Sequence, residues 1–103
     1  MTTGEVLAAL ADPTRRQLVE LLARQGAGTA TTLARELPVT RQAVVQHLSV
    51  LRTAGLVSSR KSGRDVRFQL HPDVLTETAR WMNEVAAAWD QRLATIKAIA
   101  EGT

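Results

Sequence analysis

The chain has 103 residues, of which 45% are hydrophobic and 22% charged, as is typical of a single globular domain. It contains no cysteine, which excludes disulfide bonds, thiolate metal sites and a cysteine nucleophile. The longest early apolar stretch, residues 6–11, is too short to cross a bilayer, and no basic residue precedes it as in a signal peptide. We therefore expect a cytoplasmic protein without a membrane partner.

The positive charge is concentrated in one third of the chain. Residues 1–39 carry four basic and four acidic side chains, whereas residues 40–71 carry six basic side chains and one acid. Residues 72–103 carry three basic and five acidic side chains. A polyanion is the natural partner of such a basic segment, although charge alone fits a solvated surface equally well.

The chain begins with the signals of two helices. Apolar side chains within residues 5–10 fall on one face of a short first helix. Asp12 and Pro13 suit the N-cap and first position of a second helix, because aspartate accepts hydrogen bonds from free N–H groups and proline leaves none unpaired. Leucines recur at three- and four-residue spacing up to about Gln25, and Gly26 is expected to end this helix.

The following segment has the signals of a loop and a short helix. Residues 26–28 contain two glycines and are expected to form the loop. Thr31 is expected to cap a third helix that extends to Leu37. Pro38 ends that helix, because the residue before a proline is pushed out of helical geometry.

Residues 40–70 predict a helix followed by a β-hairpin. Thr40 is expected to cap a fourth helix over residues 41–53. The apolar period then shortens to that of a strand, which predicts strands at residues 56–60 and 66–70 around a turn at residues 62–65. The buried stripe of the helix is expected to consist of Val44, Leu48 and Leu51. The inward side chains of the second strand are expected to be Val66, Phe68 and Leu70.

His71-Pro72-Asp73 is expected to end the second strand and to start a last helix that continues to about Ala100, with apolar residues that repeat every seven positions. One face can pack on its own domain, which leaves apolar surface that a monomer should not expose. The elements together predict a mainly α fold with a small β-hairpin wing: a dimeric winged helix-turn-helix of five helices, in one domain over residues 1–103. Its terminal helices are expected to form the dimer interface, through Val6, Leu7, Leu10, Leu75, Trp81, Met82, Val85, Trp89, Leu93 and Ile96.

This order of elements makes duplex DNA the expected partner. An α-helix fits the major groove, where glutamine can pair with adenine and a valine methyl can contact thymine. Arg41 can reach a phosphate or a guanine edge, and Arg64 at the hairpin tip suits the minor groove or its phosphates. In isolation, a polar helix face is usually only solvated, and an arginine in a turn is usually only a turn residue. The expected DNA-binding residues are Thr40, Arg41, Gln42, Val45, Gln46, His47, Ser49, Arg60, Lys61, Arg64 and Arg67.

Three segments resemble the ArsR family of metalloregulator-like repressors: residues 12–18 (DPTRRQL), residues 46–57 (QHLSVLRTAGLV), and the wing residues Ser62-Gly63-Arg64 with Phe68-Gln69-Leu70. Val45 and Gln46 depart from the serine and arginine of the family pattern, so the operator sequence should differ from that of better-matched members. The resemblance implies a homodimer that binds an inverted-repeat operator and represses transcription until an effector releases it. Its two recognition helices would then lie about 34 Å apart, one turn of DNA.

The residues with which this family senses metals are missing from the sequence. No cysteine stands in the third helix, and the only histidines are His47 and His71. His71, Asp73 and Glu77 form the only near cluster of ligand types, but a second histidine on the same helical face is lacking. We therefore expect no metal and no cofactor. A small apolar effector near Trp81 and Trp89 is an alternative role for surface that otherwise fills the dimer interface.

Two other classes of function compete with DNA binding. An enzyme is disfavoured, because the sequence has no paired histidine and carboxylate, no glycine loop that could cradle a phosphate and no close carboxylate pair. A winged helix used only for protein contacts would be expected to have a neutral or acidic wing. The basic segment at residues 40–71 argues against that role.

Overall fold

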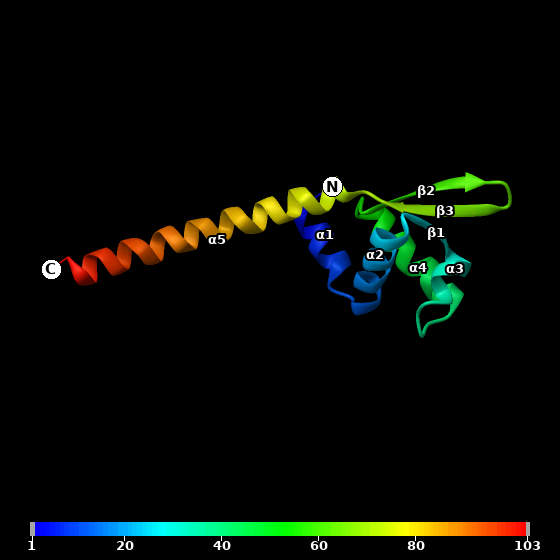
Figure 1. Cartoon of the computed structure of the whole chain (residues 1–103), viewed down its shortest axis with the longest axis horizontal. Helices are drawn as coiled ribbons and strands as arrows, with labels where there is room; N and C mark the ends of the chain where they lie inside the picture. Colours follow the sequence, from blue (N-terminus) through cyan, green and yellow to red (C-terminus); the bar gives the residue numbers. More distant parts are fainter. Residues whose placement is uncertain (1, 103) are drawn as a thin grey trace.

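The computed structural model describes residues 2–102, which form five helices and a three-stranded sheet (Figure 1). In chain order the elements are α1 (Thr3–Leu10), α2 (Pro13–Gln25), β1 (Ala27–Thr29), α3 (Ala30–Ala34), α4 (Arg41–Thr53), β2 (Val57–Ser62), β3 (Asp65–Leu70) and α5 (Pro72–Glu101). The expected winged helix-turn-helix architecture is confirmed. The β2–β3 hairpin, here called the wing, and the long α5 project in opposite directions, so the molecule is 71 Å long but only 24 by 21 Å across (Figure 1).

Side-chain caps start α2 and α4 at the predicted residues. The backbone N–H of Arg15 donates to the carboxylate of Asp12 at 3.0 Å, and that of Ala43 donates to Oγ1 of Thr40 at 3.1 Å. Each cap gives a partner to an N–H group that has none within the helix. The helices therefore begin where the sequence signals place them.

The prediction of a loop at residues 26–28 is wrong in part, because Ala27–Thr29 forms strand β1, which pairs with β3. The sheet order is β1-β3-β2, with all pairs antiparallel. Gly28 is buried, and a Cβ atom there would lie 3.1 Å from the side chain of Leu33. The glycine that suggested a loop therefore lets the strand approach α3 closely.

The start and end of α3 also differ from the prediction. Thr29, not Thr31, is the N-cap: its Oγ1 accepts from the backbone N–H of Thr32 at 3.1 Å, and Oγ1 of Thr32 accepts from the backbone N–H of Thr29 at 3.0 Å. Only residues three apart can cap each other in this reciprocal way. The helix ends at Ala34, so Leu37 lies in the turn that follows.

A single hydrophobic core lies under the helices and the base of the sheet. The predicted stripe of α4 is confirmed, since Val44, Leu48 and Leu51 are fully buried. Val6 of α1 is only 2% exposed within its own chain, so it belongs to this core and is not on the surface as an interface residue would be. Leu10 and Leu75 are partly buried against the same core.

The wing ends in a two-residue loop of Gly63 and Arg64. Gly63 has a φ of 62°, the left-handed conformation that a type II′ hairpin turn needs at its first central residue. Both strands are confirmed, and each extends further toward the turn than the sequence predicted. Arg64 therefore lies at the tip of the wing.

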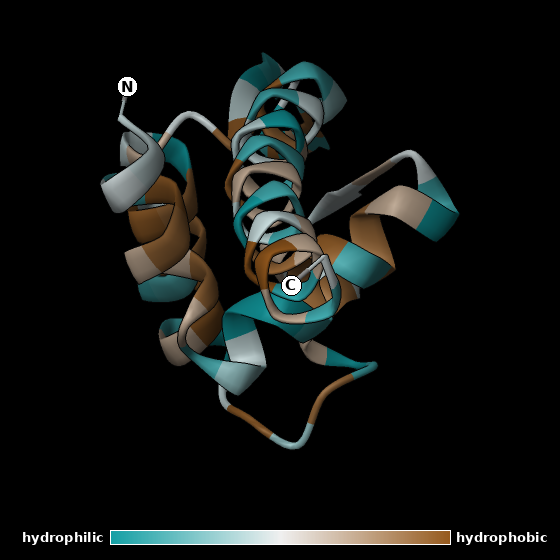
Figure 2. Ribbon diagram, turned by 90° about the vertical axis from the view of Figure 1, so that its left-hand side faces the viewer, coloured by the Kyte–Doolittle hydropathy of each residue, from teal (hydrophilic) through white to brown (hydrophobic). Residues whose placement is uncertain are grey.

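Only the beginning of α5 packs on the rest of the chain, through contacts with α1. Val74 and Thr78 are buried, whereas every residue from 79 to 102 is exposed. Figure 2 looks along this helix from its C-terminal end and shows hydrophilic and hydrophobic residues alternating along its ribbon. Among residues 2–102, no helix is both long and apolar enough to cross a membrane.

Candidate nucleic-acid interface

α4 presents a polar face on the side opposite its buried stripe. The exposed residues of this face are Arg41, Gln42, Val45, Gln46 and Ser49, as the helical spacing predicted. At the start of α4, Nε of Arg41 donates to Oγ1 of Thr31 at 3.0 Å and ties α4 to α3. The cap residue Thr40 is exposed as well. Long polar side chains thus line a helix that the core holds at a fixed rotation.

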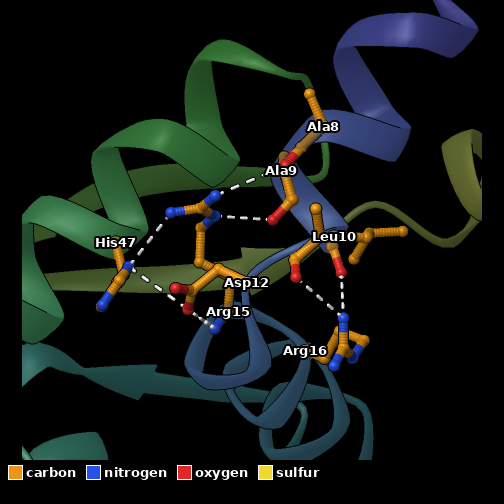
Figure 3. Close-up of polar contacts among 8 residues, drawn as sticks. Ala8, Ala9, Leu10, Asp12, Arg15, Arg16 and His47 are labelled. Carbon is orange, nitrogen blue, oxygen red and sulfur yellow. Dashed lines mark hydrogen bonds and ion pairs between the residues drawn. The ribbon is translucent and has the colours of Figure 1, made fainter.

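His47 is turned toward α2, away from this polar face (Figure 3). Its side chain is only 23% exposed, and its Nδ1 lies 3.9 Å from Oδ2 of Asp12 and 3.4 Å from Nη1 of Arg15. We expected His47 among the DNA-binding residues. The structure places its Nδ1 in a polar cluster behind α4, which we call the Asp12–Arg15–His47 cluster.

The same cluster reaches the end of α1 (Figure 3). Nε of Arg15 donates to the carbonyl oxygen of Ala9 at 2.6 Å, and Nη1 of Arg16 donates to that of Leu10 at 2.7 Å. Carbonyls at the end of a helix have no partner within it, and arginine side chains can supply one. Arg15 therefore joins α1, α2 and α4 at one point.

The wing separates its basic residues onto two faces. Residues paired across an antiparallel ladder point to the same side, and neighbours along a strand point to opposite sides. Arg60 pairs with Arg67, and Lys61 pairs with Val66. The two arginines therefore lie side by side on one face, while Lys61 lies on the other.

A groove of about 390 Å³ lies between α4 and the wing. Neither the groove nor the contribution of Arg52 to it was predicted from the sequence. Nη1 of Arg52 donates to Oγ of Ser59 at 3.0 Å, which links α4 to β2. The groove is lined by Thr29, Ala30, Thr31, Arg41, Val45, Ser49, Arg52, Arg64, Asp65, Val66 and Phe68.

Val66 lines this groove, so the prediction that it points into the core is wrong. It is 43% exposed, whereas Phe68 and Leu70 on the same side of β3 are partly buried against the core. β1 pairs with residues 67–69 only, so Val66 lies on the part of the wing that extends beyond the body of the domain. Its side of the strand therefore has no core to face.

The structure shows no candidate metal centre in the part of the chain that it describes. Within residues 2–102, no three histidine, aspartate or glutamate side chains gather closely enough to hold a metal ion. His71 precedes α5 without a side-chain cap hydrogen bond, and Asp73 lies in the first turn of that helix. A carboxylate at this position interacts favourably with the helix dipole.

The Asp12 cap should make stability depend on acid pH. The backbone N–H of Arg15 holds the pKa of Asp12 below its usual range, and the nearby charges of His47 and Arg15 act in the same direction. A carboxyl whose pKa is lowered by folding stabilises the fold above its unfolded pKa, about 3.9, and loses this contribution as the pH falls through the folded pKa. Asp12→Ala should therefore lower the melting temperature at pH 7, by an amount that shrinks below about pH 4.

Asp12→Asn is the matched control for this prediction, because asparagine keeps the cap but not the charge. Its melting temperature at pH 7 should fall between those of the wild type and Asp12→Ala. If the gap between Asp12→Ala and the wild type stayed constant down to pH 2, the charge of Asp12 would have no part in it.

The Arg60–Arg67 pair should cost stability. Like charges directly opposite each other on a sheet repel, and such pairs change stability by about 0.2–1 kcal/mol. Arg60→Thr should therefore raise the free energy of unfolding by a few tenths of a kcal/mol in urea titrations at low salt, and the gain should shrink at high salt. Arg60→Lys keeps the repulsion and should give no gain. An equal gain in both variants would mean that charge is not the cause.

The fold agrees with that of known proteins. A model of the helix-turn-helix domain matches residues 10–60. The transcriptional repressor SdpR of Bacillus subtilis is 31% identical over 77% of this chain and 87% of its own length. The HTH-type transcriptional regulator Rv2034 of Mycobacterium tuberculosis is 55% identical, but the match spans 62% of this chain and only 59% of that protein.

Solved structures match over more of the chain. An ArsR-like transcriptional regulator from Rhodococcus sp. RHA1 superposes with a TM-score of 0.87 at 44% identity, covering 98% of this chain and 94% of that one. The homodimeric winged helix-turn-helix DNA-binding domain of a Mycobacterium bovis protein gives a TM-score of 0.67 at 28% identity, covering 82% and 77%. The chain belongs to the ArsR family of winged helix-turn-helix transcriptional regulators.

Proposed function

We propose that this regulator is a homodimeric repressor that binds an inverted-repeat operator in duplex DNA through α4 and the wing. The observation that carries the proposal is that the polar face of α4 borders an arginine-lined groove and a basic wing. A helix that lies in the major groove beside a wing is the arrangement by which winged helix-turn-helix domains bind DNA. The homodimeric Mycobacterium bovis domain has the same fold.

α4 is the proposed recognition helix. Gln42 and Gln46 are exposed one turn apart, and each can pair with the N6 and N7 edge of an adenine. Val45, which is 40% exposed between them, can contact a thymine methyl group. The base sequence of the operator is therefore read mainly by these three side chains, with Ser49 one turn further along.

The basic side chains supply attraction that does not depend on sequence. Arg64 at the wing tip can reach the minor groove that adjoins the major groove entered by α4. Arg41, the first residue of α4, can reach a phosphate. Arg60, Lys61 and Arg67 point to different sides of the wing, so they contact different parts of the backbone. Contacts of this kind release counterions from DNA, and binding then weakens steeply as salt rises.

α5 is the proposed dimer interface. From Trp81 onward its large apolar side chains are 43–65% exposed, whereas its first turns pack on α1. A continuous apolar row of this length is rare on a monomer and typical of a helix that pairs with a second copy. Its exposed members are Trp81, Met82, Val85, Trp89, Leu93, Ile96 and Ile99. We propose that α1 also contributes to the dimer interface, through Leu7, which is 36% exposed. Leu10 and Leu75, which are partly buried at the edge of the core, would border this interface.

The proposed role is regulation of transcription by DNA binding in the cytoplasm, without catalysis. A small apolar effector that binds near Trp81 and Trp89 would act on the dimer helix, and a shift there would move the two copies of α4 relative to each other. Tryptophan emission that stays unchanged across a panel of candidate effectors would argue against this site.

Gln46→Ala and Arg64→Ala should weaken DNA binding in different ways. Loss of a base contact should reduce discrimination between operator variants by about 1–3 kcal/mol at one base pair, whereas loss of a phosphate contact should weaken binding to all sequences alike. Fluorescence anisotropy with an operator selected from random duplexes, and with its single-base variants, measures both. Gln25→Ala, at the exposed end of α2, is the control for Gln46→Ala.

The same titrations test the proposed function as a whole. Unchanged discrimination in Gln46→Ala would mean that α4 enters the groove in a different register. Wild-type affinity for the duplex that does not fall with rising salt would argue against the proposed phosphate contacts, and absence of binding to any duplex would favour an apolar protein contact.

Trp89→Glu should weaken the dimer. Trp89 is 56% exposed and lies outside the core, so the variant should keep its fold and melting behaviour. An aromatic residue at the centre of an interface often contributes about 2 kcal/mol or more, which corresponds to roughly thirtyfold weaker association. Sedimentation equilibrium measures the change. Gln91→Glu adds the same charge two residues away and should leave the dimer intact; equal effects of both variants would place the interface elsewhere.

A further inference from the structure

The groove between α4 and the wing collects arginines that lack acidic partners. Arg41, Arg52 and Arg64 all line it, and within residues 2–102 none of them forms a salt bridge with a carboxylate. Arg41 and Arg52 donate to neutral hydroxyl groups, those of Thr31 and Ser59. Asp65 is the single acid in the lining. Three guanidinium groups against one carboxylate leave the groove with a net positive charge, which favours an anion as its occupant.

The position of the groove indicates which anion this is. The major and minor grooves of duplex DNA are separated by a phosphodiester strand. If α4 lies in the major groove and Arg64 reaches the adjacent minor groove, the strand that divides them must pass between α4 and the wing. The described groove occupies that space.

We propose that this groove seats one phosphodiester strand of the bound duplex, with Arg52 as a phosphate-binding residue. The inference rests on the proposed function and adds to it a contact from the last turn of α4, one turn beyond Ser49. Arg52 is suited to the task because Ser59 engages Nη1 and leaves the other guanidinium nitrogens for phosphate oxygens.

The apolar wall of the groove fits the same occupant. Val45 and Val66 are 40% and 43% exposed in the free chain, on facing sides of the groove. A backbone strand presents deoxyribose carbons between its phosphates, and contact with them would cover Val66 and the groove-facing side of Val45. Water excluded in this way also strengthens the nearby charge interactions. Contact with the DNA backbone would therefore explain why Val66 is exposed in the free chain.

Arg52→Ala tests the proposal through the salt dependence of binding to a fixed mixed-sequence duplex. Each phosphate contact contributes about 0.9 to the slope of log affinity against log salt, so a dimer that loses two contacts should lose about twice that amount. Arg24→Ala removes the same charge from the exposed end of α2 and should change the slope much less. Equal slopes in the two variants would overturn the proposal.

Two further variants separate phosphate binding from support of the wing. Ser59→Ala removes the hydrogen bond but keeps the charge of Arg52, so its slope should match the wild type. Arg52→Lys should also keep most of the slope, with lower affinity because the planar two-point contact is lost. If Ser59→Ala reduced the slope as much as Arg52→Ala does, Arg52 would only hold the wing and the proposal would fail.

A chemical test locates the contact on the DNA. Single phosphates of a selected operator are replaced in turn by neutral methylphosphonates, and affinity is measured for the wild type and for Arg52→Ala. At the phosphate that Arg52 contacts, the replacement should weaken the wild type but cause little further loss in the variant. Additive losses at every phosphate would overturn the inference, while a steep wild-type salt slope would still support DNA binding.

Discussion

The burial of one stripe of α4 determines the rest of the interface. Val44, Leu48 and Leu51 are fully buried, so the helix cannot rotate about its axis without exposing them to water. Burying a valine or leucine side chain contributes about 1.5–3 kcal/mol, which makes the three together a strong constraint. The polar face opposite the stripe is therefore presented in a fixed direction. The Asp12–Arg15–His47 cluster supports the same helix from behind and ties it to α1 and α2.

The wing shows how function opposes stability in this fold. Arg60 and Arg67 face each other across the ladder, and three more arginines surround the adjoining groove without carboxylate partners. A chain selected only for stability would replace some of these charges, because repulsion at these positions brings the isolated protein no benefit. A polyanion changes the balance, since each phosphate neutralises charge that the fold leaves unpaired. The three arginines of the groove therefore mark the same surface as the exposed face of α4, while Arg60 and Arg67 lie on the opposite face of the wing.

Local signals predicted the helices well, because caps and apolar spacing lie within a few residues of the features that they define. α4 and α5 follow directly from Thr40, from the proline at position 72 and from apolar periodicity. β1 was missed because its strand character depends on pairing with β3, some forty residues away in the chain. Arg52 was missed for the same reason: its position in a basic groove depends on how the wing lies against α4. The exposure of Val66 depends on where the core ends, which no local pattern contains.

α5 connects this surface to the proposed dimer, because the DNA-binding elements lie at one end of a helix about 45 Å long (Figure 1). When two such helices pair, their register sets the distance between the two copies of α4. Sliding one helix by a single turn would move its domain by about 5.4 Å, a large error against half-sites spaced by one or more whole turns of DNA. The proposed effector therefore need not touch the DNA-binding surface to release it from DNA. A small change among the apolar residues of α5 would be enough, and that helix carries both tryptophans of the chain.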